Sequence, residues 1–163
     1  MPYVLDANVM IEAKRRHYGL DFCPAFWDWL GVAHAKGALH SIEKVEDELR
    51  EGKDELTTWA TGCDAGFFVK PDDPMIKALS KVSAWLNSTN YTPSAKAEFL
   101  SAADYYLIGH ALAHNHTVVT HELPEPNRMG KVKIPDACIA VGVKWTTPFK
   151  MLRAEKAHFK LGP

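Results

Sequence analysis

Two hydrophobic patterns follow one another along the chain, and together they predict alternating strands and helices. Short runs rich in apolar and β-branched residues are typical of buried strands, whereas apolar residues three or four positions apart are typical of helices with one buried face. The predicted strands cover residues 2–6, 38–42, 66–71 and 117–122. The predicted helices cover residues 8–16, 24–36, 42–51, 54–60, 74–88, 101–116 and 147–159.

The residues between and around these segments complete the prediction. Ser41 is expected to cap the helix at 42–51, and Gly52 to end it. Residues 123–133 are rich in Pro, Asn and Gly and predict a loop, whereas residues 134–145 fit neither pattern clearly. Strands separated by helices favour an α/β fold with a mostly parallel sheet, in which ligands bind at the carboxyl ends of the strands.

The composition excludes several classes of protein. A length of 163 residues, with 47% hydrophobic and 24% charged residues, predicts a single globular domain over residues 1–163. No apolar run approaches about 18 residues and no signal segment is evident, so neither a membrane span nor secretion is expected. Three cysteines without CxxC spacing indicate free thiols in the cytoplasm. A net charge of -1 weakens the case for nonspecific nucleic-acid binding, although a local basic face remains compatible with it.

Four carboxylates occupy positions that the pattern predicts to be at or near the buried side of their elements. Asp6 ends the first strand and Glu122 ends the strand at 117–122. Asp104 heads an apolar helical stripe, and Glu48 borders the buried face of its helix. Isolated buried carboxylates are costly, and several together raise each other's pKa. A divalent cation resolves both problems, and oxygen ligands of this kind suit Mg²⁺ or Mn²⁺.

Each carboxylate also has a purely structural interpretation. Asp6 can cap the following helix, and Asp104 can form a capping box with Ser101. Glu48 lies in an acidic stretch and can be an ordinary surface residue, while Glu122 can simply begin the loop. Taken singly, these interpretations are at least as good as a metal site. The occurrence of four such acids on four elements favours the site.

Three segments resemble the motifs of the PIN-domain family of nucleases. The opening VLDANVMI resembles the first motif, with Asp6 after an apolar strand. SIEKVEDELREG resembles the second, in which Glu48 and Leu49 are followed by a glycine. AADYYLIGHALAHNHTVVTHE resembles the third and fourth together, with Asp104 at a helix start and Thr120 before Glu122. The order and spacing of the set agree over nearly the whole chain.

The resemblance implies a three-layer sandwich with helices on both sides of a central, mostly parallel sheet. It further implies an Mg²⁺- or Mn²⁺-dependent endoribonuclease. The catalytic and metal-binding residues would be Asp6, Glu48, Asp104 and Glu122, and Asn8 and Thr120 would support these acids or the attacking water. Small members of this family are mostly VapC-like toxins of type II toxin–antitoxin pairs. An RNA substrate and an antitoxin protein are therefore the expected partners, and a homodimer is left open as an assembly.

The fourth motif departs from the family pattern. Family members usually carry Asp after Thr-x, whereas this chain carries the longer Glu122. Asp136 lies in the following segment and is an alternative for the same role. Which of the two acids completes the site is left open by the sequence.

A basic run follows the first acid. Lys14, Arg15 and Arg16 are candidate contacts for RNA phosphates, and the competing interpretation is a solvated helix end favoured by the helix dipole. His110 and His114 have the i, i+4 spacing found in zinc sites. Because there is no HExxH motif and no third ligand is evident, the sequence does not predict a zinc site.

Two other functions compete with the nuclease. A phosphatase of the haloacid dehalogenase type also begins with a strand ending in Asp, but it needs a second Asp two residues later, where this chain has Asn8. The other alternative is a non-catalytic PIN-like binding module in which the acids are structural.

Overall fold

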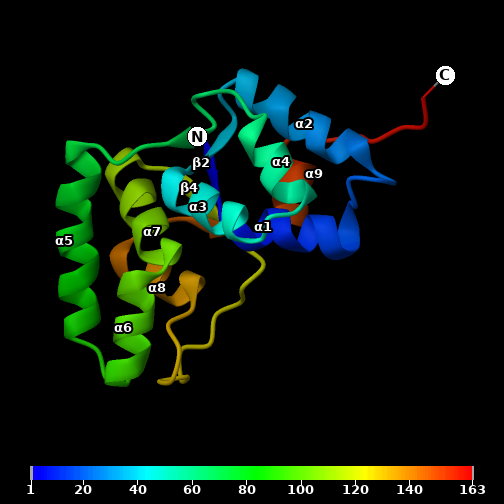
Figure 1. The fold of residues 1–163 in the computed structure, drawn as a ribbon. Helices are drawn as coiled ribbons and strands as arrows, with labels where there is room; N and C mark the ends of the chain where they lie inside the picture. The colour runs from blue at the N-terminus through cyan, green and yellow to red at the C-terminus, as the bar shows by residue number, and fades with distance from the viewer. Residues whose placement is uncertain (1, 163) are drawn as a thin grey trace.

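The sheet of the computed structural model, which describes residues 2–162, has five parallel strands (Figure 1). They are β1 (Tyr3–Leu5), β2 (Leu39–Ile42), β3 (Phe68–Val69), β4 (Thr117–Val119) and β5 (Trp145–Thr146). Their order across the sheet is β3-β2-β1-β4-β5, and every neighbouring pair is parallel. The predicted α/β class and parallel sheet are therefore confirmed.

Helices connect and cover the strands. They are α1 (Ala7–Glu12), α2 (Pro24–Ala35), α3 (Glu43–Glu51), α4 (Glu55–Thr61), α5 (Asp73–Asn87), α6 (Pro93–Ser101), α7 (Ala103–His114), α8 (Ile134–Val141) and α9 (Pro148–Ala154). A π-helical turn, η1 (Ala13–His17), extends α1. Figure 1 shows α5, α6 and α7 stacked on one side of the sheet and α2, α4 and α9 on the other, as a three-layer sandwich requires.

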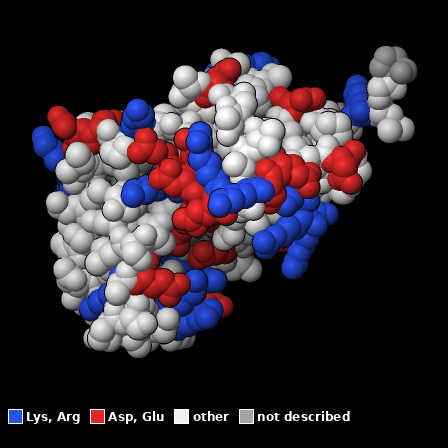
Figure 2. All heavy atoms as spheres, viewed as in Figure 1, with Lys and Arg blue, Asp and Glu red and all other residues white. Residues whose placement is uncertain are grey.

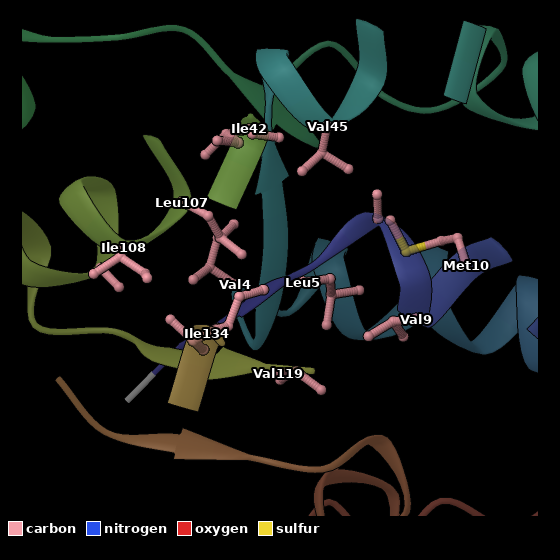
Figure 3. Packing of buried hydrophobic residues seen from close by; sticks show 14 of the residues in the cluster. Val4, Leu5, Val9, Met10, Ile42, Val45, Leu107, Ile108, Val119 and Ile134 are labelled. Carbon is pink, nitrogen blue, oxygen red and sulfur yellow. The ribbon is translucent and has the colours of Figure 1, made fainter. Parts of the chain in front are cut away.

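The core lies where the central strands meet these helices (Figure 3). Val4 of β1 is completely buried, as are Leu107 and Ile108 of α7. Close packing of α7 against its outer neighbour α5 depends on Gly109, because a Cβ atom there would lie 2.5 Å from Cδ2 of Leu79. The position of α7 between the sheet and α5 is thus set by a tight fit on both of its sides.

The strand order creates a switch point between β1 and β4. From β1 the chain moves outward in one direction through β2 and β3, and then returns to add β4 and β5 on the other side. In open parallel sheets, ligands bind outside the carboxyl ends of the two strands at such a point. The residues that follow β1 and β4 are Asp6 and Thr120, so the topology puts the first and fourth motifs at the expected binding edge.

Several local predictions were wrong. The Ser41 hydroxyl does not cap α3; it donates a 2.6 Å hydrogen bond to the Leu5 carbonyl, and the cap position belongs to Ile42. Residues 93–101 form α6, which the sequence analysis did not predict, although Thr92 caps it and Pro93 begins it. The strand expected at 66–71 is reduced to two residues, because the chain turns away beyond β3.

The segment 134–145, for which the sequence favours neither helix nor strand, contains α8 and the start of β5. Cys23, Cys63 and Cys138 are free. No helix within residues 2–162 combines the length and the apolar character that crossing a membrane requires.

Candidate metal centre

Asp6, the first of the four acids along the chain, lies immediately after β1. Its backbone N–H donates to the Val119 carbonyl at 3.0 Å and so continues the ladder between β1 and β4. Although Asp6 occupies the cap position of α1, its side chain makes no capping hydrogen bond. The carboxylate is only 3% exposed and instead accepts a 3.0 Å hydrogen bond from the Thr120 hydroxyl. The structural interpretation of Asp6 as a helix cap is therefore wrong.

Thr120 links Asp6 to the fourth acid. This completely buried residue follows β4, and its hydroxyl oxygen accepts a 3.1 Å hydrogen bond from the Glu122 backbone N–H. The same hydroxyl donates to Asp6, so one side chain positions both acidic segments. The Glu122 carboxylate accepts from the Ile134 backbone N–H at 3.1 Å and lies 3.9 Å from the Lys133 ammonium.

Asp104 and Glu48 come from the helices that meet above this edge of the sheet. Asp104 lies in the first turn of α7, whose N-cap residue, Ala102, makes no side-chain capping hydrogen bond. The Glu48 carboxylate reaches across from α3 and accepts a long 3.4 Å hydrogen bond from the Ala103 backbone N–H. Ser101 ends α6 and donates to Glu98, so the capping box proposed between Ser101 and Asp104 is absent. A carboxylate at a helix N-terminus is favoured by the helix dipole, which helps to keep Glu48 near Asp104.

The four acids are close enough to disturb one another's ionisation. Burial raises the pKa of Asp6 well above its usual range, and the negative charges of Asp104 and Glu122 raise it further. Burial and the charges of Glu122 and Glu48 raise the pKa of Asp104 to about 7. Burial also raises the pKa of Glu48. The structure thus brings together the four acids that the sequence singled out.

The negative charge of this group favours a divalent cation, although within residues 2–162 no three of its carboxylates lie as close together as the ligand atoms of His40, His110 and His116. The only ion pair that any of the four acids makes within residues 2–162 is the 3.9 Å contact of Glu122 with Lys133. Asp6 is buried with one hydrogen bond from a neutral hydroxyl, which leaves most of its charge uncompensated. Carboxylate oxygens from four elements are the donors that Mg²⁺ and Mn²⁺ prefer.

Asp136 and Asn8 are the two other polar candidates. The Asp136 carboxylate accepts a 2.8 Å hydrogen bond from the Glu125 backbone N–H in the loop after β4. It is not among the groups that shift the pKa of Asp6 or Asp104, whereas Glu122 is. Asn8 is exposed at the edge of a cavity of about 540 Å³ that Glu122 also lines. Of the two acids that the sequence left open, Glu122 is the one whose charge raises the pKa of Asp6.

Basic residues border the acids on two sides. A cavity of about 350 Å³ beside Glu48 is lined by Lys14 and Arg15, and the cavity beside Glu122 is lined by Arg16 and Lys133. Figure 2 shows acidic side chains gathered over the middle of this face, with basic side chains on both sides of them. The face therefore combines a negative centre with positive flanks, which is the arrangement that an anionic chain bound to cations requires.

The three predicted RNA contacts differ in how strongly they are held. Lys14 forms an ion pair with Asp54, the residue that caps α4. Arg16 lies 3.2 Å from Glu12 on the preceding turn. Arg15 is exposed and makes no ion pair within residues 2–162. Of the three, Arg15 is the most available for a phosphate.

Sequence reasoning missed several charged residues around these acids. Lys131 lowers the pKa of Asp104, and Lys133 approaches Glu122. Both lie in the segment that was predicted only as a loop, and no periodic pattern marks them. The histidine group was also missed, because His40, which lies close to His110 and His116, is on β2 and far from them in the sequence.

Two comparisons place the chain among known proteins, and a third finds nothing. No protein of curated function matches it. A structure of VapBC2 from Rickettsia felis, bound to a DNA fragment from its promoter, is 16% identical with a TM-score of 0.57 and covers 90% of this chain and 98% of that one. The structure of FitAcB from Neisseria gonorrhoeae is 18% identical, with the same TM-score and coverage. FitAB bound to an IR36 DNA fragment is 16% identical with a TM-score of 0.56, and it covers 99% of both chains.

These similarities define the fold and the family. At this level of identity the solved structures show a shared fold, which is that of the matched chains of VapBC2, FitAB and FitAcB. A family profile matches residues 3–159, which is nearly the whole chain. The chain belongs to the family described as "Domain of unknown function (DUF4411)".

Proposed function

We propose that this protein is a divalent-metal-dependent endoribonuclease and the toxin of a type II toxin–antitoxin pair. The observation that carries the proposal is the convergence of Asp6, Glu48, Asp104 and Glu122 at the switch point of the sheet, with Asp6 buried and uncompensated. The acids come from the four elements that carry the four PIN motifs. The shared fold with VapBC2 and FitAB supports the same class.

The four acids would hold Mg²⁺ or Mn²⁺, directly or through water. Such an ion lowers the pKa of a water molecule and neutralises charge on a scissile phosphate. In this chain Thr120 would fix the orientation of the Asp6 carboxylate, since its hydroxyl donates to that group. Burial of Asp6 beneath the other acids would exclude bulk water from one side of the site.

The two bordering cavities would accept the RNA on either side of the acids. Lys14 and Arg15 beside Glu48 would contact phosphates on one side, and Arg16 and Lys133 beside Glu122 would contact them on the other. Asn8, at the edge of the second cavity, is in a position to hydrogen-bond a phosphate or an attacking water. A net charge of -1 is compatible with RNA binding, because the RNA would be bound by this local basic rim and not by the charge of the whole chain.

Cleavage of a single-stranded RNA by the purified chain in Mn²⁺ tests the proposal. Asp6→Asn and Asp104→Asn should each reduce the cleavage rate by at least about 100-fold, the scale expected when a group that stabilises transition-state charge is lost. Asp136→Asn is the matched control, because its carboxylate lies outside the acid group and Asn can still accept from Glu125. It should cleave like the wild type.

Two outcomes would favour the competing functions. Hydrolysis of a generic phosphate ester by a chain that leaves RNA intact would point to a phosphatase. Folded protein that neither cleaves RNA nor gains thermal stability with Mn²⁺ would point to a non-catalytic module. Wild-type cleavage by both Asp6→Asn and Asp104→Asn would remove the acids from the mechanism.

The antitoxin proposal needs its own test. VapBC2 and FitAB are both solved on DNA, which supports a DNA-binding partner for this chain as well. Coexpression with the small protein encoded beside its gene should yield a stable complex and should suppress RNA cleavage. Failure of the two proteins to copurify would leave the nuclease proposal intact and overturn the toxin assignment.

A further inference from the structure

Four histidines gather at the amino-terminal edge of the sheet, opposite the acids. This histidine cluster consists of His40, His110, His114 and His116, and its neighbouring ring centroids lie between 4.8 and 5.8 Å apart. The acids at the other edge do not explain it: Asp104 lies in the first turn of α7, whereas His110 and His114 lie in its last two turns. The separation along the helix between Asp104 and His110 is about 9 Å at 1.5 Å per residue.

The sheet itself brings His40 toward His116. β2 and β4 lie on the two sides of β1, where Val4 pairs with His40 on one strand and with Val118 on the other. Paired residues point to the same face, and so does a residue two positions away. His40 and His116 therefore face the same side of the sheet, the side that α7 covers.

The end of α7 supplies the other two histidines. Asn115 ends the helix in the left-handed conformation, with φ 56° and ψ 47°, a conformation that Asn adopts more readily than most residues. The His116 backbone N–H then donates to the Ala111 carbonyl at 3.0 Å. This turn joins α7 to β4 within two residues and holds His114 and His116 close to His110.

The ring nitrogens have the spacing of metal ligands. Nε2 of His40 lies 2.8 Å from Nε2 of His110. One ligand atom from each of His40, His110 and His116 lies within 4.8 Å of the others. Ligands at the usual Zn–N distance of 2.0–2.1 Å around a tetrahedral ion are about 3.3 Å apart. To hold the ion, His40 and His110 would move apart by about 0.5 Å, and a pair of ligand atoms as far apart as 4.8 Å would close by up to about 1.5 Å.

Several of these nitrogens lack a good partner within the described part of the chain. Nδ1 of His110 and Nδ1 of His116 are buried without a hydrogen bond, and His110 as a whole is only 5% exposed. Nε2 of His114 lies 2.8 Å from an Asp72 carboxylate oxygen, but it is not aligned for a hydrogen bond. Unpaired buried nitrogens of this kind cost stability; a nitrogen that is not itself a ligand, such as Nδ1 of His110 when its Nε2 binds the ion, would be satisfied by a water molecule from the cavity.

A route to solvent and a neutral charge state complete the arrangement. A cavity of about 330 Å³ is lined by His40, His110, His114, His116 and Asp72, so an ion can enter and keep a water ligand. Burial lowers the pKa of His40 to about 4 and that of His110 to about 3, and the imidazoles are then neutral, as metal binding requires.

We propose that His40, His110 and His116 bind a transition-metal ion of the zinc class, with the fourth position open to water from the cavity. Imidazole nitrogen suits Zn²⁺, whereas Mg²⁺ prefers the oxygen ligands at the other edge. His114, with the Asp72 carboxylate 2.8 Å from its Nε2, borders the three ligands without being one of them. The bound ion would tie β2 to the junction of α7 and β4 and so stabilise the fold by mass action.

Calorimetry with Zn²⁺ on the metal-free full chain, in excess Mg²⁺ to occupy the acids, tests the site. We expect one Zn²⁺ per chain and a rise in melting temperature. His110→Gln and His116→Gln should each weaken Zn²⁺ binding by more than about 100-fold, because even loss of an outer partner typically costs 10–100-fold. Co²⁺ in place of Zn²⁺ should give the visible absorption of a tetrahedral ion, and His110→Gln should abolish it.

His34→Gln is the matched control. His34 lines the same cavity, but its Nδ1 is paired with the Leu39 carbonyl at 2.9 Å and it lies outside the three-ligand group. It should bind Zn²⁺ like the wild type. An unchanged stabilisation by Mn²⁺ in His116→Gln, together with an unchanged circular dichroism spectrum, shows that the variant has folded. Folded wild type without Zn²⁺ binding, or unweakened binding by both His110→Gln and His116→Gln, would overturn the site without touching the nuclease proposal.

Discussion

The two ends of α7 carry ionisable groups of opposite character. At its N-terminus Asp104 joins three other acids, and burial together with neighbouring negative charges raises the pKa of Asp104 and of Asp6. At its C-terminus His110 joins three other histidines, and burial together with repulsion from its neighbours lowers the pKa of His110 and of His40. The same helix and sheet thus hold a hard oxygen-ligand group at one edge and a nitrogen-ligand group at the other.

The contrast shows how topology selects chemistry. Parallel strands direct all their carboxyl ends to one edge, where helix N-termini also begin and favour negative charge. The opposite edge receives helix C-termini, which favour positive groups, but burial outweighs this effect at His110 and lowers its pKa. The acid group therefore lies where the helix dipoles favour it, the histidine group is kept neutral by burial, and each group should bind a different ion.

Metal removal should separate the two ends most strongly. Treatment with a chelator should reduce RNA cleavage by at least about 100-fold, since the acids lose the ion that offsets their charge. Mg²⁺ or Mn²⁺ should restore cleavage, whereas one equivalent of Zn²⁺ per chain should not, because the histidine cluster takes it first. Initial cleavage rates after each addition measure this. Restoration by a single equivalent of Zn²⁺ would break the division between the two sites.

The pH dependence of stability in the metal-free protein should have opposite signs at the two ends. The raised pKa of Asp104 stabilises the fold below about pH 4, and this contribution is lost as the pH rises through about 7. The depressed pKa of His110 acts in reverse: its contribution is present above about pH 6.5 and is lost as the pH falls toward about 3.

Urea unfolding of two variants across this pH range measures both signs. The advantage of Asp104→Asn over the wild type should grow to roughly 1–3 kcal/mol as the pH rises, whereas that of His110→Gln should grow as the pH falls. The groups around each side chain must be unchanged in the comparison. Around Asp104 they are Asp6, Glu48, Glu122 and Lys131. Around His110 they are His40, His114, His116 and Asp72. Parallel curves for the two variants would contradict the assignment of opposite charge states.

The sequence allowed one end of α7 to be predicted and not the other. Asp6 and Asp104 were found because each stands at a recognisable place, a strand end and a first helical turn, and their order matched a known set of motifs. His40 and His110 are 70 positions apart and belong to no motif. Their contact depends on the packing of α7 against β2, which no local pattern encodes.

The missed details of the fold have similar physical causes. Ser41 looks like a helix cap because of its position before α3, but the buried Leu5 carbonyl on the next strand takes its hydroxyl. α6 is short and weakly amphipathic, so its apolar pattern was not noticed, although Thr92 and Pro93 were available as start signals. The sequence could not distinguish the roles of Asp136 and Glu122, because the hydrogen bond that Asp136 accepts from the Glu125 backbone N–H depends on the conformation of the loop.

Thr120→Val should weaken the acid end while it leaves the histidine end intact. Valine keeps the buried volume but removes the donor to Asp6 and the acceptor for the Glu122 backbone N–H. We expect a loss of about 10-fold in cleavage and about 1–2 kcal/mol in stability, as for a buried hydrogen bond to a charged group. Thr120→Ser should recover most of both, and Zn²⁺ binding should remain unchanged in either variant. An equal loss in Thr120→Ser would show that packing, and not the hydroxyl, is what matters.

The smallest expected effect concerns the basic rim of the acid end. Arg15→Ala should reduce the salt dependence of RNA binding by about one phosphate contact, because Arg15 is exposed beside Glu48 and is free of the ion pair that holds Lys14. Arg16→Ala should change the slope less, since Arg16 lies 3.2 Å from Glu12 and must leave that partner to reach a phosphate. Binding of labelled RNA to the catalytically inactive Asp104→Asn background over a range of salt concentrations measures both slopes. Equal slopes for Arg15→Ala and the parent would mean that the basic run is only a solvated helix end. RNA recognition would then be confined to the cavity beside Glu122 and Lys133.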